Sequence, residues 1–160
     1  MNLHGMSGPV REFTENILRV FPEWASTLEC SGEGDDTDDC SFCVVPPAHP
    51  THRLYVAARG NSVEVRYDDA EPPGPAEKLF VDLDQQPPEV AAAVVGFVRD
   101  IISGRIVVVR ERLPRFVRWI RRDCDSTASF RGADELKSRR RAKVIASYSW
   151  TTMAQNRANP

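Results

Sequence analysis

The sequence predicts an α+β domain with a mostly antiparallel sheet of about five strands, packed by an N-terminal and a central helix. Three observations lead to this fold class: an apolar stripe at helical spacing near the N-terminus, a pair of alternating segments around a tight-turn dipeptide, and a second helical stripe in mid-chain. Strands that mix with helices in this order are typical of α+β domains. At 160 residues the chain is expected to form a single domain, residues 1–160.

Residues 8–24 predict the first helix. Pro9 suits the first helical turn, and Pro22 is expected to end the helix. The apolar residues that recur at helical spacing are Val10, Phe13, Ile17 and Phe21. Residues 25–50 show no period and are rich in Gly, Asp, Ser, Cys and Pro. They are predicted to form an irregular acidic loop that contains cysteine and histidine.

Residues 54–59 and 63–68 alternate between apolar and other side chains, and the dipeptide "GN" lies between them. This pattern predicts a two-residue β-hairpin. A third strand is expected in "EKLFVDL", with Leu79, Val81 and Leu83 on one face.

The central helix is expected over "PPEVAAAVVGFVRDIISG", and its polar surface is small. Proline opens it, and Gly104 stands where a left-handed cap belongs. Its expected buried stripe is Val90, Val94, Phe97, Val98 and Ile101. Four further segments follow: a strand in "RIVVVRER", a strand extension or short basic helix in "RFVRWIRR", a polar helical turn in "GADELKSRRRAK" and a final strand in "AKVIASYSW".

The net charge of −2 conceals a strong asymmetry along the chain. Residues 1–98 hold 6 Lys/Arg against 17 Asp/Glu, a difference of −11, and residues 99–160 hold 15 against 6, a difference of +9. Such an uneven distribution of charge favours a surface that attracts a charged partner. The alternative is that the two halves interleave in space and their charges cancel.

The sequence contains no apolar run long enough for a membrane span, and its N-terminus lacks the pattern of a signal peptide. We therefore expect a cytoplasmic protein with no membrane partner. In a reducing compartment, four cysteines favour free thiols or metal ligands over disulfides.

The cysteine and histidine cluster in the predicted loop has three interpretations. The pair Cys40-x-x-Cys43 could supply two zinc ligands, with Cys30 and His49 completing a set of four. However, His49 and His52 follow the cysteine pair more closely than in common zinc fingers. Neighbouring carboxylates also raise thiol pKa values and disfavour the thiolate that binds metal. Plain loop thiols without a cofactor are the favoured interpretation, zinc is the second, and a disulfide from Cys30 to Cys40 or Cys43 is the third.

The acidic run in the same loop contains no basic residue. It lacks the closing Glu of a calcium-binding loop. It could be a solvated loop without a role, or an anionic surface that docks into a cationic groove built for phosphates. The residues expected to contact such a partner are Asp35, Asp36, Asp38 and Asp39, then Asp68, Asp69 and Glu71, with Trp24 and Tyr67 as aromatic anchors.

Enzyme signatures are absent: the sequence has no nucleophile elbow, HExxH motif, phosphate-binding glycine loop or dinucleotide fingerprint. The chain is therefore expected not to be an enzyme. The clusters "RFVRWIRR" and "KSRRRAK" could bind phosphates of a nucleic acid. A pI near 5.9 argues against a dedicated nucleic-acid binder, so solvated or ion-paired arginines are favoured.

Residues 61–112 contain a strand that ends in "YDD", a "PPGPAE" crossing and a helix that ends in "SGRI". In this plan they resemble small immunity proteins of bacterial polymorphic-toxin and contact-dependent competition systems. The resemblance implies a protein that is not an enzyme and that binds one cognate toxin, covering its active site with acidic and aromatic residues. A basic toxin is then the expected partner. The alternatives are a small nucleic-acid-associated regulator that uses the basic C-terminal half, or a zinc-binding scaffold.

Overall fold

The structure is a computed structural model that describes residues 6–31, 39–47, 49–68, 75–112, 126–138, 144–148 and 150. In chain order the elements are α1 (Gly8–Val20), the 3-10 helix η1 (Pro22–Thr27), β1 (Leu28–Ser31), β2 (Asp39–Val44), β3 (Arg53–Arg59), β4 (Ser62–Asp68), β5 (Ala76–Val81), α2 (Pro87–Ile102), β6 (Ile106–Arg112), β7 (Ser126–Gly132), α4 (Ala133–Ser138) and β8 (Val144–Tyr148). The predicted segment "RFVRWIRR" lies outside the described residues.

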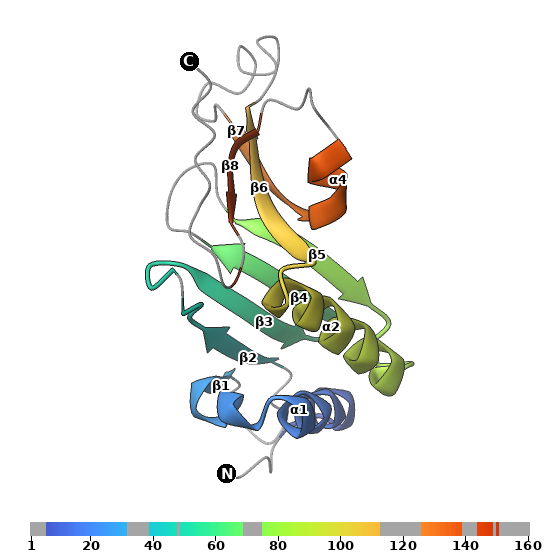
Figure 1. The fold of residues 1–160 in the computed structure, drawn as a ribbon. Coiled ribbons are helices and arrows are strands. Elements are labelled where there is room, and N and C mark those ends of the chain that lie inside the picture. Colours follow the sequence, from blue (N-terminus) through green and yellow to red (C-terminus); the bar gives the residue numbers. More distant parts are fainter. Residues whose placement is uncertain are drawn as a thin grey trace. The chain divides into compact units, whose positions relative to one another are not determined.

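The strands form two sheets (Figure 1). One has five strands in the order β1-β2-β3-β4-β5, and the other has three in the order β7-β6-β8. The pairs β1–β2, β2–β3, β6–β7 and β6–β8 are antiparallel. The α+β fold class, with a mostly antiparallel five-stranded sheet, an N-terminal helix and a central helix, is thus confirmed. The strands that form the five-stranded sheet differ from those expected, because β6 and β8 belong to the smaller sheet.

The chain divides into two compact units. The first comprises residues 1–44, 54–66 and 78–98, and the second comprises residues 45–53, 67–77 and 99–160. The single domain expected from the length stays a prediction.

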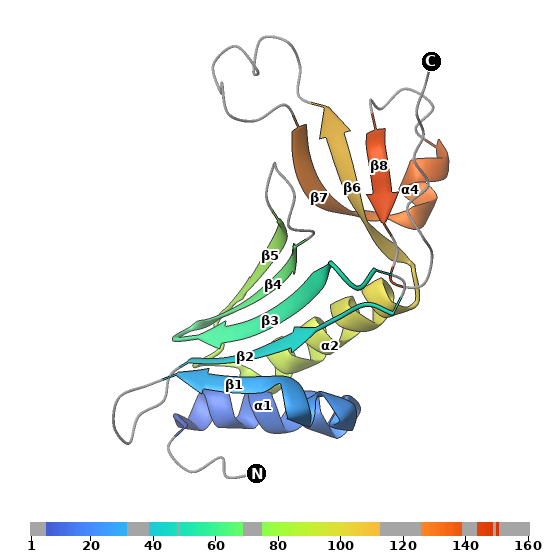
Figure 2. The same cartoon turned by 90° about the vertical axis from the view of Figure 1, so that its left-hand side faces the viewer.

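In the first unit, α1 and α2 lie on the same side of the five-stranded sheet (Figure 2). Side chains alternate along each strand, so one face of the sheet meets both helices. Phe42, Val56 and Val65 on that face are fully buried. From the helices, Phe13 and Ile17 of α1 are equally buried. The core therefore lies between this face and the two helices.

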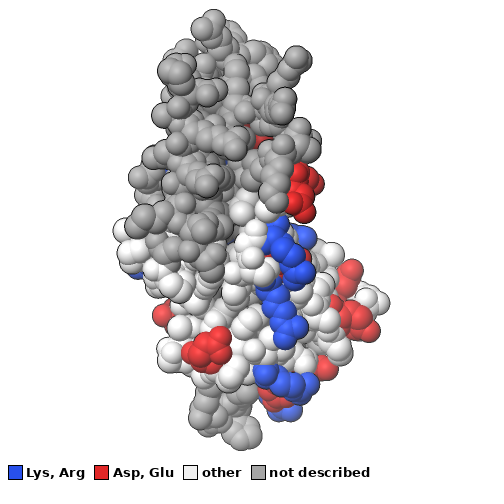
Figure 3. Space-filling model, in the orientation of Figure 1, with Lys and Arg blue, Asp and Glu red and all other residues white. Residues whose placement is uncertain are grey.

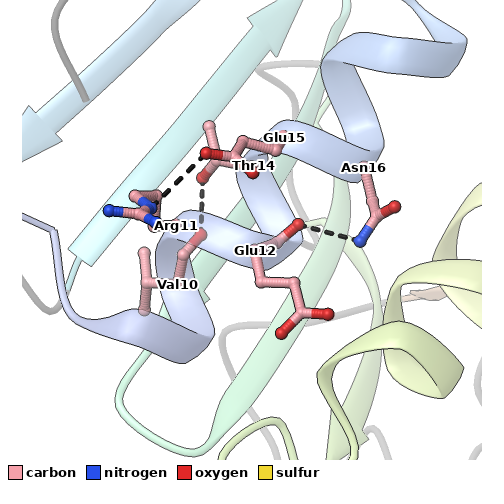
Figure 4. Close-up of polar contacts among 6 residues, drawn as sticks. All are labelled: Val10, Arg11, Glu12, Thr14, Glu15 and Asn16. Carbon is pink, nitrogen blue, oxygen red and sulfur yellow. Dashed lines mark hydrogen bonds and ion pairs between the residues drawn. The ribbon is translucent and has the colours of Figure 1, made fainter.

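Helix α1 follows the predicted stripe, and Pro9 stands in its first turn as expected. Figure 4 shows the polar contacts of this helix. On its exposed side, Arg11 forms an ion pair with Glu15 at 3.4 Å. The Asn16 side-chain amide donates a hydrogen bond to the Glu12 backbone carbonyl at 2.9 Å. Thr14 is buried instead, and its hydroxyl donates to the Val10 carbonyl at 2.8 Å. This hydroxyl has a second contact, with Cys40, which is described below.

The hairpin β3–β4 is confirmed, with its turn at Gly60 and Asn61. Gly60 has φ of +52° and Asn61 does not share a positive φ, which is the pattern of a type II′ turn.

The expectation that Leu79, Val81 and Leu83 share one face of the third strand was wrong. Leu79 and Val81 of β5 are exposed, at 61% and 56%, whereas Leu83 is fully buried. The reason is Asp82, whose φ of +67° ends the strand and breaks its alternation before Leu83. Phe80 and Lys78 of β5 meet the helix side. The Phe80 ring lies 5.8 Å from that of Phe97 in α2, and the Lys78 Nζ lies 4.2 Å from the centre of the Phe97 ring.

Helix α2 buries the stripe that its sequence predicts. It ends as expected at Gly104, which has φ of +75° and donates its N–H to the Ile101 carbonyl at 3.0 Å. The second unit then places β6 between two partners, with a register irregularity between Arg110 and Glu111 on the β8 side. Strand β7 was not predicted, since Phe130 is its only large apolar residue.

The irregular loop expected over residues 25–50 was wrong in large part. Its described portion holds the end of η1 and the strands β1 and β2. Strand β2 does carry a short alternation, in which Cys40 and Phe42 are buried and Ser41 and Cys43 are half-buried. Two cysteines, a serine and an aspartate dilute the apolar signal too far for composition alone to reveal it.

Candidate functional site

The acidic segment connects two paired strands. The last register pair of β1 and β2 joins Ser31 to Asp39. The residues between them, 32–38, include the predicted contact residues Asp35, Asp36 and Asp38, which lie outside the described residues. We call the strands β1 and β2 with this connection the acidic hairpin. Of the acidic run, Glu29 and Asp39 are thus placed on paired strands of the sheet.

The acidic hairpin forms one edge of the five-stranded sheet, since β1 is the terminal strand. Glu29 is exposed and Asp39 is half-buried. A hollow of about 300 Å³ lies at this edge. Its lining residues are Glu29, Cys30, Asp39, Cys40, Ser41 and Arg59. Arg59 is the register partner of Asp39 across β2 and β3, so a basic group does accompany the acids in the folded chain.

Cys30 and Cys40 are direct cross-strand partners in the acidic hairpin. Cys30 is exposed, and Cys40 is buried against α1, where its Sγ lies 3.0 Å from the Thr14 hydroxyl oxygen. Thr14 already donates its only hydroxyl hydrogen to Val10, so in this contact the Cys40 thiol donates. Burial raises the pKa of Cys40 from 9.0 to about 11 and also raises the pKa of Cys30. Cys40 is therefore a protonated thiol at neutral pH.

The proposed zinc ligands do not come together. Cys43 is three residues from Cys40 on the same strand, and its side chain points to the other face, where its register partner is Tyr55. Within the described ranges, no three His, Cys, Asp or Glu side chains are close enough to hold a metal ion. The structure thus brings Cys30 and Cys40 together and places Cys43 on the other face of the sheet.

The two histidines stack on each other in the second unit. The rings of His49 and His52 have centroids 4.7 Å apart and are nearly parallel, and both residues are buried. Backbone hydrogen bonds from His49 to Pro46 and from His52 to His49 hold the turn that places them. Nδ1 of His52 lies 3.0 Å from the Tyr67 hydroxyl. These histidines are packed polar residues of the interior.

The two expected aromatic anchors are buried, which corrects their predicted role. Trp24 is 3% exposed and stacks on Phe21 at 4.5 Å. Tyr67 is also 3% exposed and points its edge to His52. Both fill the interior, and neither is available to a partner in this conformation. Of the remaining predicted residues, Asp68 is half-buried at the end of β4, whereas Asp69 and Glu71 lie outside the described residues.

Sequence reasoning missed two exposed apolar residues on the open face of the five-stranded sheet, the face away from the helices. Leu79 and Val81 project from it, and the Arg66 guanidinium lies 4.7 Å from the centre of the Tyr55 ring. The signal was present in the alternation of β5, but the position of Asp82, which decides which set is buried, was not recognised.

Net charge follows the division into units. The first unit holds 5 Lys/Arg and 13 Asp/Glu, a difference of −8, and the second holds 16 and 10, a difference of +6. On the face shown in Figure 3, the described acidic side chains lie in separate groups and do not form one patch. The densest run of carboxylates in the sequence is the connection of the acidic hairpin with Asp39.

Comparison with protein-family models, with curated proteins and with solved structures gave no match. Function is therefore argued from the chemistry of the chain itself. No helix in the described part of the chain combines the length and the apolar character needed to cross a bilayer.

Proposed function

We propose that this chain is an immunity protein, which neutralises a cognate bacterial toxin by binding it stoichiometrically over its active site. The toxin is a basic protein, and the acidic hairpin is the surface that meets its cationic groove. The chain itself is not an enzyme, and it acts in the cytoplasm.

The observation that carries the proposal is the position of the acidic hairpin. Its connection holds Glu33, Asp35, Asp36 and Asp38 and no basic residue, and it joins the paired ends of two strands. A partner that docks on this end of the sheet therefore meets a segment of the chain in which carboxylates are dense and cations are absent. Charge of this kind speeds encounter with a cationic groove and disfavours acidic competitors.

Carboxylates steer a partner more than they anchor it, so an interface also needs an apolar centre. Trp24 and Tyr67 are buried, and among the described residues of the first unit the exposed large apolar side chains are Leu79 and Val81 on β5. Five strands spaced about 4.8 Å apart span about 19 Å from β1 to β5. An interface of about 800 Å² per partner is wide enough to cover that distance. We place the apolar contact on the open face accordingly.

Affinity capture tests the proposal. The tagged full chain is incubated with lysate of the native host at low salt, and proteins and nucleic acids bound at one-to-one are identified. The proposal predicts a single basic protein whose toxicity or activity is abolished when the chain is added. Capture of nucleic acid with no protein partner would instead favour a regulator that uses the basic clusters at residues 115–122 and 137–143.

Two variant baits identify the surface of the chain that binds the captured partner. In the test bait, Asp35, Asp36, Asp38 and Asp39 are replaced by lysine. In the matched control bait, four exposed acids of the helices α1, η1 and α2 are replaced by lysine, giving the same change in net charge: Glu12, Glu15, Glu23 and Glu89. Loss of the partner with the test bait alone assigns binding to the acidic hairpin. Equal loss with both baits would contradict that assignment.

A further inference from the structure

The base of the acidic hairpin holds two cysteines whose arrangement is not used by the proposed binding function. Cys30 and Cys40 are Cα partners in antiparallel strands, so their side chains leave the same face of the sheet. Both also line the hollow at the sheet edge. One thiol is exposed and the other is buried directly behind it.

The distances between facing strands suit a disulfide at this position. Residues directly opposite each other have Cβ atoms about 4.5–5.5 Å apart, and a disulfide needs about 3.5–4.5 Å. The gap to be closed is thus about 1 Å. Strand β1 is paired on one side only, so its backbone can make this approach without disturbing a second neighbour. Cys43 has no such partner, because it points to the opposite face beside Tyr55.

We propose that Cys30 and Cys40 are an oxidisable pair that peroxide converts to a cross-strand disulfide at the base of the acidic hairpin. This modification site goes beyond the proposed toxin binding and does not depend on it. The oxidant is a peroxide of small size, such as hydrogen peroxide, which reaches Cys30 from solvent.

The reaction balances in two steps. The Cys30 thiolate attacks one peroxide oxygen, so that an S–O bond forms, the O–O bond breaks and hydroxide leaves to become water. The Cys40 sulfur then attacks the Cys30 sulfur, the S–S bond forms, and the oxygen leaves as water with the proton of Cys40. Two thiols are oxidised by two electrons, and one peroxide is reduced to two waters.

The hydrogen bonding and the burial of the two cysteines affect how readily they are oxidised. The Cys40 thiol donates to Thr14 in the reduced state and gives up this hydrogen bond when the disulfide forms. Burial raises the thiol pKa values of both residues, so the reactive thiolate is scarce at neutral pH and its amount rises with pH. Oxidation is consequently slow at neutral pH and faster in alkaline solution.

Peptide mapping after mild oxidation tests the proposal. The reduced full chain is treated with hydrogen peroxide, the remaining thiols are alkylated, and the chain is cut without reduction by a protease specific for Asp. This specificity matters because trypsin would leave Cys30, Cys40 and Cys43 on one peptide, whereas Asp35 to Asp39 offer cleavage sites between Cys30 and Cys40. We expect one intramolecular cross-link, a loss of two hydrogen atoms and faster formation at higher pH.

Single substitutions identify the partner. The cross-link persists in Cys43→Ser and is lost in both Cys30→Ser and Cys40→Ser. A cross-link that persists in Cys40→Ser and disappears in Cys43→Ser would overturn the proposal. Oxidation of Cys30 alone, with Cys40 still alkylatable after unfolding, would overturn it as well. Circular dichroism of each reduced variant checks that the sheet is intact.

Discussion

At the scale of single residues, a buried chain of hydrogen bonds runs from Cys40 through Thr14 to the Val10 carbonyl. It joins strand β2 to helix α1, with distances of 3.0 Å and 2.8 Å. All three residues are buried, so each donor left without an acceptor would carry a desolvation cost. This chain fixes the position of β2, and so of the acidic hairpin, against the helix.

The Thr14–Cys40 contact predicts a measurable coupling. Thr14→Val removes the acceptor with little change in volume, and Cys40→Ala removes the donor. Because each change alone already breaks the same hydrogen bond, we expect the double variant to lose about 0.5–1 kcal/mol less stability than the sum of the single variants. Urea unfolding of the four proteins measures this difference. Strict additivity would show that the two side chains do not interact.

The raised pKa of Cys40 predicts a loss of stability in alkaline solution. Its folded value of about 11 lies above the ordinary 9.0, so its contribution is complete below pH 9 and is lost as the pH rises toward 11. Two pKa units correspond to about 2–3 kcal/mol. Other groups titrate in this range, so the informative quantity is the difference from Cys40→Ser, which has no thiol. We expect the free energy of unfolding to fall more steeply for the natural chain between pH 9 and 11; parallel curves would contradict the assignment.

At the scale of elements, β5 offers a direct test of which face of the sheet is buried. Leu79 is 61% exposed and Phe80 packs on Phe97, so the two neighbours should respond differently. We expect Leu79→Thr to change the free energy of unfolding by less than about 0.5 kcal/mol. We expect Phe80→Ala to cost about 1–2 kcal/mol, since it removes a half-buried ring from an aromatic pair. Chemical denaturation of both variants checks this order, and a larger cost at Leu79 would reverse the assignment.

The acidic hairpin predicts a kinetic effect on partner binding. With Asp35, Asp36, Asp38 and Asp39 replaced by lysine, association with the cationic partner should slow by about ten-fold or more at low salt, because attraction becomes repulsion. The difference should shrink as salt screens the charges. Stopped-flow or surface-based kinetics across a salt series measures it. An association rate equal to that of the matched control variant would remove the hairpin from the interface.

The elements that the sequence alone predicts are those with a strong period or a decisive turn. Helix α2 has an unbroken stripe between a proline pair and Gly104, and β3–β4 has Gly60 at the one position that needs a positive φ. Strands β1 and β7 carry few large apolar side chains, and their place comes from pairing with β2 and β6. Such pairing depends on contacts distant in sequence and leaves little local signal.

The same reasoning explains what was predicted of the site. The carboxylates are visible in composition, so the acidic character of residues 29–39 could be recognised directly. The cross-strand pairing of Cys30 with Cys40 could not be predicted from the sequence, because it depends on the register between β1 and β2. Burial of Trp24 and Tyr67 could not be predicted either, since an aromatic residue beside a polar segment serves equally well as an anchor or as core.

At the scale of the whole molecule, acidic and basic residues are unevenly divided between the two units. The first unit has an excess of eight acidic charges and the second an excess of six basic charges, although the chain as a whole is near neutrality. A neutral chain with one strongly acidic unit can attract a basic partner without being acidic overall.

The measurement that tests the central claim most directly is a titration of the captured partner. The partner's toxic or catalytic activity is followed as the full chain is added, together with the mass of the complex in solution. The account predicts a linear loss of activity that is complete at one equivalent, with a one-to-one complex that the hairpin variant fails to form at the same concentrations. Activity that persists beyond several equivalents, in the presence of a stable complex, would contradict the claim that this chain neutralises its partner by covering the active site.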